Sequence, residues 1–159
     1  MTHPLSQTQM GIYVTSMNNQ TEGNYNIDKL FKLDDDVDIE RLASALEKVI
    51  EAHPYVKSRL VMSDEGEVVF EDHSDDDFHA SVIEINDIED VRNHLGEDYD
   101  LLNDQLFRIE IYKTKNGNYL YYDFHHIIFD GFSVVVFCEE LSKAYDGEAL
   151  EPEPTDGFA

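Results

Sequence analysis

The dipeptide Asn116-Gly117 separates two runs rich in apolar and aromatic residues, 106–113 and 118–124. An Asn-Gly pair between such runs is typical of a tight β-turn, because both residues tolerate the positive φ angles that this turn needs. The sequence therefore predicts an antiparallel hairpin. Residues 131–145 carry apolar residues at helical spacing, so the hairpin is expected to lead into a helix.

Apolar residues at helical spacing predict the core-facing sides of three helices. They are Leu42, Ala45, Leu46, Val49 and Ile50 in a helix that starts near Asp38 and ends before Pro54; Ile88, Val91 and Leu95 in a helix after Asn86; and Phe132, Val135, Val136 and Leu141 in the last helix. A further helix is expected at residues 6–18, because Ser6 and Gln9 have the spacing of a capping box.

Strands are expected between these helices, and they set the fold class. The expected strands are 26–33, 56–62, 67–71 and 80–85, with the hairpin strands 106–113 and 118–124. A mixed, mostly antiparallel sheet covered by helices buries one face of every element. We therefore predict an α/β (α+β sandwich) unit at residues 1–147, followed by an acidic, proline-containing linker or tail at 148–159.

The charge of the chain excludes some partners. The chain has 159 residues with 35 Asp and Glu against 11 Lys and Arg, a formal net charge of -24. Nucleic acid and anionic lipid are bound by clustered cations, so neither is an expected partner. The acidic segment 72–79 contains two histidines but not the close Cys/His spacing of a zinc site, so we expect a solvated loop there and no metal.

The single cysteine, Cys138, excludes an internal disulfide and lies in an apolar run. A buried, inert thiol is the expected state for it. Because disulfides belong to oxidising compartments, and because the sequence shows no membrane-spanning run and no signal peptide, we expect a cytoplasmic protein.

Residues 124–131 read Phe-His-His-Ile-Ile-Phe-Asp-Gly and lie between the hairpin and the last helix, where loops commonly present reactive groups. Adjacent side chains on an extended chain point in opposite directions. One of His125 and His126 is therefore expected to face the core and the other a cleft. The structural alternative is a strand end with two core-facing histidines, followed by a helix that Asp130 caps.

This run resembles the HHxxxDG signature of condensation domains of nonribosomal peptide synthetases and their relatives with the chloramphenicol acetyltransferase-like fold. Residues 5–13, Leu-Ser-Gln-Thr-Gln-Met-Gly-Ile-Tyr, resemble the opening motif of that family. Residues 53–59, His-Pro-Tyr-Val-Lys-Ser-Arg, resemble its second motif, RHExLRT, with Ala52 and Pro54 in place of the leading Arg and the Glu. The family's domain has two lobes, and the match corresponds to the amino-terminal lobe.

The resemblance implies that His126 is the catalytic residue of amide-bond formation between two thioesters. Each substrate would be held on the phosphopantetheine arm of a carrier protein, and no cofactor would be bound directly. Histidine suits proton transfer because its side chain ordinarily titrates at ~6.5. Other partners implied are the second lobe and an adjacent adenylation domain.

The resemblance gives the neighbours of His126 structural roles. His125 is expected to face inward and hold the loop, and Asp130 to form an ion pair that shapes it. Arg59 is the first candidate for the partner of Asp130, with Lys57 second, and Gly131 would allow a substrate arm to approach closely.

Two alternatives remain open. An ester-forming acyltransferase that uses a coenzyme A thioester, or an epimerising domain, also carries HHxxxDG. A catalytically silent module that only binds carrier proteins would share the fold without the chemistry, and the presence of His126 and Asp130 argues against it.

Overall fold

A four-stranded sheet forms the centre of the computed structural model, which describes residues 2–18, 26–93, 95–97, 99–129 and 131–150. Its strand order is β2 (Asn26–Lys32), β7 (Gly117–His125), β6 (Phe107–Thr114) and β5 (Ser81–Glu84). β7 is antiparallel to both of its neighbours, and β5 is parallel to β6. The predicted mixed, mostly antiparallel sheet is therefore confirmed.

The hairpin β6–β7 is confirmed, with the turn one residue earlier than the Asn-Gly pattern suggests. Thr114 pairs with Gly117, so Lys115 and Asn116 form the loop and Gly117 begins β7. Gly117 has a φ of 134°, a conformation that side chains disfavour. The glycine is thus needed at the first strand position instead of inside the turn.

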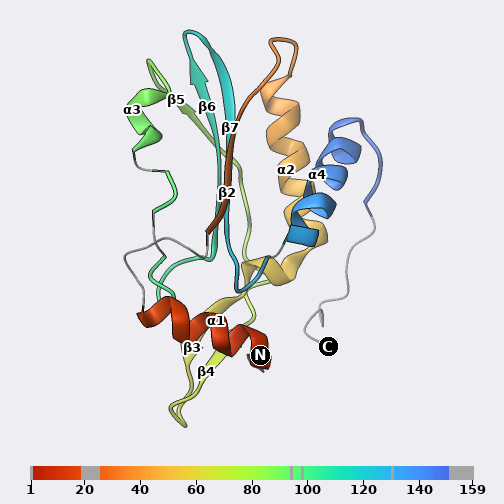
Figure 1. Ribbon diagram of the computed structural model, residues 1–159. Coiled ribbons are helices and arrows are strands. Elements are labelled where there is room, and N and C mark those ends of the chain that lie inside the picture. Colours follow the sequence, from red (N-terminus) through yellow and green to blue (C-terminus); the bar gives the residue numbers. More distant parts are fainter. Residues whose placement is uncertain (1, 19–25, 94, 98, 130, 151–159) are drawn as a thin grey trace.

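The helices α2 (Ile39–Ala52) and α4 (Gly131–Tyr145) cover one face of the sheet, as Figure 1 shows. The predicted start near Asp38 is confirmed, and Oδ1 of Asp38 caps α2 by accepting a hydrogen bond of 3.2 Å from the N–H of Arg41. All five residues of the predicted apolar stripe of α2 are buried. No helix of the described residues is both long and apolar enough to cross a bilayer.

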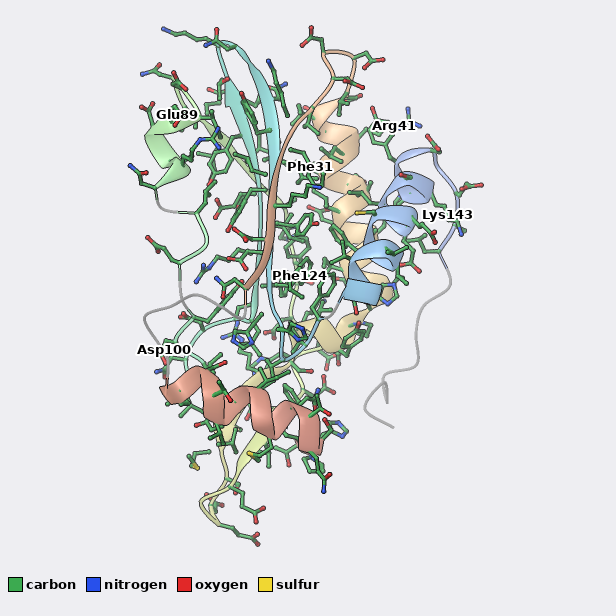
Figure 2. All side chains as sticks on the ribbon, viewed as in Figure 1. Phe31, Arg41, Glu89, Asp100, Phe124 and Lys143 are labelled. Atoms are coloured by element: carbon green, nitrogen blue, oxygen red, sulfur yellow. The ribbon has the colours of Figure 1, made fainter. Side chains whose placement is uncertain are left out.

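The inner face of α4 matches the prediction in part: Leu141 packs against the core, whereas Val135 does not, and the side chain of Phe132 lies outside the described residues. Val135 is 53% exposed, whereas Phe137 and Ala144 are buried. Phe137 packs edge-to-face against Phe124 of β7 with a centroid distance of 5.4 Å. In Figure 2, Phe31 and Phe124 lie between the sheet and α2, where the main core is formed.

The opposite face of the sheet is partly covered by the segment around α3 (Glu89–Arg92). Ile88 packs there with Tyr112 and Tyr121 in a small second core. The predicted helix after Asn86 is therefore present but only one turn long. Oδ1 of Asp87, not Asn86, accepts the hydrogen bond from the N–H of Glu89.

A second sheet has the order β1 (Thr2–Pro4), β4 (Val68–Glu71) and β3 (Arg59–Met62), and α1 (Gln7–Asn18) follows β1 in the chain. The predicted strand 56–62 is wrong in its first half, because Pro54–Lys57 forms the 3-10 helix η1. Proline favours the first turn of a helix, where its missing N–H costs nothing.

The tail boundary at 147/148 stays a prediction, since residues 151–159 lie outside the described part of the chain.

Candidate active site

The paired histidines stand at the end of β7, on the turn that leads to α4. The N–H of Ile128 donates to the carbonyl of His125 at 3.1 Å, and the N–H of Phe129 donates to that of His126 at 3.4 Å. His125 is only 3% exposed, whereas His126 is exposed. The two side chains therefore face different environments, as the alternation of an extended chain predicts.

His125 is held from three sides. Its N–H donates to the carbonyl of Leu106 at 2.9 Å, its Nδ1 accepts from the N–H of Ile127 at 3.0 Å, and its ring packs edge-to-face on Tyr99. Burial, together with the neighbouring His126, lowers the pKa of His125 to about 4. The ring is therefore neutral at pH 7, and since Nδ1 accepts a hydrogen bond, its proton sits on Nε2.

His126 lines a cleft of about 380 Å³ to which three distant segments contribute. They are the start of α1 (Ser6, Thr8, Gln9, Ile12), η1 (Tyr55), and the turn with the first turns of α4 (His126, Ile127, Ile128, Phe129, Ser133). Each of the three motif matches found in the sequence therefore supplies residues to one cleft.

Gln9 connects two of these segments. The predicted capping box is confirmed, because the N–H of Ser6 donates to Oε1 of Gln9 at 2.9 Å and the N–H of Gln9 donates to Oγ of Ser6 at 3.1 Å. Nε2 of Gln9 donates to the carbonyl of Ile127 at 3.2 Å. The cap of α1 thus also fixes the histidine turn, which the sequence pattern did not reveal.

A second, smaller cavity of about 190 Å³ lies between α2, η1, β7 and α4. Tyr55, Phe129 and Ser133 line both this cavity and the cleft. Its other lining residues are mostly apolar: Val49, Ile50, His53, Val56, Phe124, Val136 and Phe137. Nε2 of His53 is hydrogen-bonded to the carboxylate of Glu140 in α4, so a residue of the second motif joins η1 to α4.

The other predicted site residues have different surroundings. Nζ of Lys57, which is buried, donates to Glu51 at 2.8 Å and to the carbonyl of Asp76 at 2.6 Å, and so holds the acidic loop after β4. Nε of Arg59 is buried and has no hydrogen-bond partner among the described residues. Gly131 is the first residue of α4. Asp130 lies outside the described residues, so its pairing with Arg59 stays a prediction.

A buried carboxylate next to the turn is a feature that the sequence reasoning missed. Asp123 is fully buried in β7, and its Oδ2 accepts from the hydroxyl of Tyr121 at 3.0 Å, Nδ2 of Asn26 at 3.2 Å and Nη1 of Arg108 at 3.4 Å. Burial outweighs these bonds and raises the pKa of Asp123 to about 6. An Asp within the apolar run Tyr-Leu-Tyr-Tyr-Asp-Phe was the available signal.

Within the described residues, no group of three His, Cys, Asp or Glu side chains could hold a metal ion. In the acidic loop, both ring nitrogens of His73 lie within hydrogen-bond distance of carboxylates, at 2.8 Å from Glu71 and 2.9 Å from Asp76.

Cys138, expected to be buried, is exposed, although partial burial still raises the pKa of its thiol.

Comparison of the sequence with known proteins identifies the family of this chain. The family model described as "Condensation domain" matches residues 1–159. Surfactin synthase subunit 1 of Bacillus subtilis (strain 168) is 32% identical over 154 residues, which cover 95% of this chain and 4% of that protein. Bacitracin synthase 3 of Bacillus licheniformis is 30% identical over 151 residues, covering 93% of this chain and 2% of that protein.

Solved structures share the fold at lower identity. The starter condensation domain of the rhizomide synthetase RzmA superposes with a TM-score of 0.77 at 18% identity, over 97% of this chain and 40% of that one. The X-domain from teicoplanin biosynthesis has a TM-score of 0.73 at 22% identity, over 95% and 34% of the two chains. The mixed sheet and its covering helices thus have a condensation-type fold. The chain belongs to the condensation domain family, which confirms the resemblance seen in its motifs.

Proposed function

We propose that the cleft around His126 is where an amine attacks a thioester carbonyl and forms an amide bond. The observation that carries this proposal is the exposed imidazole of His126 in a cleft lined by all three motif segments. Membership of the condensation domain family supports it. Both substrates would arrive on the phosphopantetheine arms of carrier proteins.

The reaction needs a group that moves one proton. The amine nitrogen attacks the carbonyl carbon, the new C–N bond forms, and the C–S bond breaks. The imidazole of His126 takes the proton that the amine loses and returns it to the departing sulfur. General base catalysis of this kind contributes roughly 10²–10⁴-fold.

Positioning adds to this proton transfer. An α-amino group titrates at ~7.7–8.0, so part of it is already neutral near pH 7. Holding amine and thioester in reactive geometry can lower the barrier by ~7–11 kcal/mol. His126 would therefore orient the amine as well as accept its proton. The neutral His125 would support it by fixing the N–H of Ile127.

The working protein is larger than this chain. The chain spans 2–4% of the two synthases described above and about 40% of the RzmA domain. We infer that it is the amino-terminal lobe of a two-lobed domain and that the second lobe completes the substrate path. Carrier and adenylation domains of the parent protein are the expected partners, and the cytoplasm is the expected location.

The test uses the full-length protein that contains this chain, with donor and acceptor carriers loaded. Amide formation is followed by mass spectrometry in the wild type, in His126→Ala and in His79→Ala. His79 is the matched control, because its side chain is 80% exposed, its Nδ1 lies 3.4 Å from a carboxylate oxygen of Glu47, and it does not line the cleft. We expect loss of product in His126→Ala alone. Equal product in all three proteins would overturn the role of His126.

The same experiment separates the alternatives. An ester product from a coenzyme A donor, or a racemised thioester, would indicate another reaction on the same fold. A binding module without catalysis is the second candidate, because the X-domain that shares the fold was also solved as a complex with OxyB. That role predicts no product in the wild type and stable capture of a partner protein.

A further inference from the structure

We propose that Tyr99 is a positioning residue for the reaction at His126 and that it acts through His125. Tyr99 lies in the segment between α3 and β6, outside all three motif matches. The kinetic part of this inference rests on the proposed function, whereas its geometric part is testable without it.

Tyr99 contacts the end of β7 in two ways. Its ring packs edge-to-face on the ring of His125, with centroids 5.7 Å apart and an interplanar angle of 81°. Its hydroxyl donates a buried hydrogen bond of 2.9 Å to the carbonyl of Asp123, two residues before His125. One side chain therefore fixes both the imidazole and the strand that carries it.

Arg108 holds Tyr99 in this place from the other side. Its guanidinium lies 4.1 Å from the centroid of the Tyr99 ring, a cation–π contact. Nη1 of the same guanidinium donates to the carbonyl of Glu97 at 2.8 Å and to Oδ2 of Asp123 at 3.4 Å. Arg108 thus connects the segment before Tyr99 to β7.

Hydrogen bonds on each side of Tyr99 also fix its backbone. The N–H of Gly96 donates to the hydroxyl of Tyr121 at 2.7 Å. After Tyr99, the N–H of Asp104 donates to the carbonyl of Asp100 at 2.7 Å, and Oδ2 of Asp104 accepts from the N–H of Asp100 at 2.8 Å. Tyr99 is therefore a pre-organised support instead of a flexible cover.

The consequence for the site follows from His125. Its Nδ1 accepts from the N–H of Ile127, so the ring orientation decides where the turn places His126. A ring free to rotate would release that N–H and let the turn relax. Because reactive groups must be held within a fraction of an ångström, the loss of Tyr99 is expected to slow the chemical step.

The geometric test is protection of His125 from diethyl pyrocarbonate, which modifies accessible neutral imidazoles. Labelling of the full-length protein is read by tandem mass spectrometry. In the wild type we expect His126, which is exposed, to be modified and His125, which is buried, to be protected. We expect Tyr99→Leu to bring the labelling rate of His125 within about tenfold of that of His126. Unchanged protection of His125 in Tyr99→Leu would overturn the proposal.

Tyr112→Leu is the matched control. Tyr112 is similarly buried and lies in the neighbouring strand β6, but its hydroxyl bonds to Glu110 and its ring belongs to the second core. We expect His125 to stay protected in this variant. Equal exposure of His125 in both variants would mean that Tyr99 only fills space, and would overturn a specific role.

The kinetic test separates kcat from KM. Tyr99→Phe keeps the ring and removes only the bond to Asp123, so kcat should fall about threefold to tenfold, the effect of one ordinary hydrogen bond. KM for the acceptor should not change. Tyr99→Leu should lower kcat further, and Tyr112→Leu should stay within about twofold of the wild type. Wild-type kcat in Tyr99→Phe and Tyr99→Leu would overturn the proposal.

If Tyr99→Leu does not fold, the kcat of Tyr99→Phe decides alone. If the wild type forms no amide, the proposed function fails, and the labelling of His125 still decides whether Tyr99 positions the turn.

Discussion

Gln9 and Ile127 are 118 residues apart in the sequence and are joined by a hydrogen bond of 3.2 Å from Nε2 of Gln9 to the carbonyl of Ile127. Ile127 also donates its N–H to Nδ1 of His125. The two peptide units that flank Ile127, the residue after His126, are thus fixed by a helix cap at the carbonyl and by a buried imidazole at the N–H. Both bonds can be removed separately.

Gln9→Glu separates the cap of α1 from the bond to the turn. Glutamate still accepts from the N–H of Ser6, as in a capping box, but it cannot donate to the carbonyl of Ile127. We expect kcat to fall about threefold to tenfold and the free energy of unfolding to fall by about 1–3 kcal/mol. Turnover and urea denaturation measure the two effects, with the helix content from circular dichroism unchanged. Wild-type turnover and stability would contradict this role for Gln9.

His125→Asn and His125→Leu form a matched pair. Oδ1 of asparagine can replace Nδ1 as the acceptor for the N–H of Ile127, whereas leucine leaves that buried N–H without a partner. An unsatisfied buried donor costs about 1–3 kcal/mol. Urea denaturation should therefore show His125→Leu less stable than His125→Asn by about that amount. Equal stability of the two variants would mean that the bond contributes nothing.

His125 and Asp123 should affect the pH dependence of stability in opposite directions. The pKa of His125 is lowered from 6.5 to about 4, so as pH falls through this window only the unfolded state gains the proton and stability is lost. The pKa of Asp123 is raised from 3.8 to about 6. As pH falls through this window, the folded state gains the proton before the unfolded state does, so stability increases. Between about pH 6 and pH 4 the two contributions largely cancel.

Asp123→Asn removes one of these contributions. We expect its free energy of unfolding to fall more steeply than that of the wild type from pH 6 to pH 4, by about 1 kcal/mol per pH unit. His125→Asn should show the opposite difference in slope. Urea denaturation at several pH values measures both. Parallel curves for all three proteins would show that neither group has a shifted pKa.

The two faces of α4 should respond differently to truncation. Phe137 is buried against Phe124, so Phe137→Ala is expected to cost about 3–5 kcal/mol. Val135 is exposed, so Val135→Ala should change stability by at most about 0.5 kcal/mol. Thermal or urea denaturation compares them. A large loss in Val135→Ala would indicate that this face is covered in the intact protein.

The elements that the sequence predicts well are those with strong local signals. The apolar stripe of α2, the capping box of Ser6 and Gln9 and the hairpin around Asn116 each depend on residues a few positions apart. The strand expected at 56–62 fails in its first half because an apolar pattern does not separate a short strand from the turn that Pro54 begins. β1 has three residues, too few for any periodicity.

The candidate site also has features that local sequence patterns predict and features that they do not. The opposite environments of His125 and His126 follow from the alternation of side chains along an extended strand. The contacts of Tyr99 and Gln9 with the end of β7 and the turn join segments 24 to 118 residues apart, and no local pattern encodes them. The inner face of α4 also depends on how the helix meets Phe124, so the apolar spacing alone misplaced Val135.

The place of β7 inside the sheet has a consequence for the lifetime of the site. β7 is hydrogen-bonded to β2 on one side and to β6 on the other, so the histidine turn directly follows an interior strand of the sheet. Interior strands open only when most of a domain unfolds, whereas edges and termini fray continually. The outer elements β1, β5 and α3 can therefore open and reclose many times, as a visiting partner or a protease would detect, while the two histidines keep their arrangement.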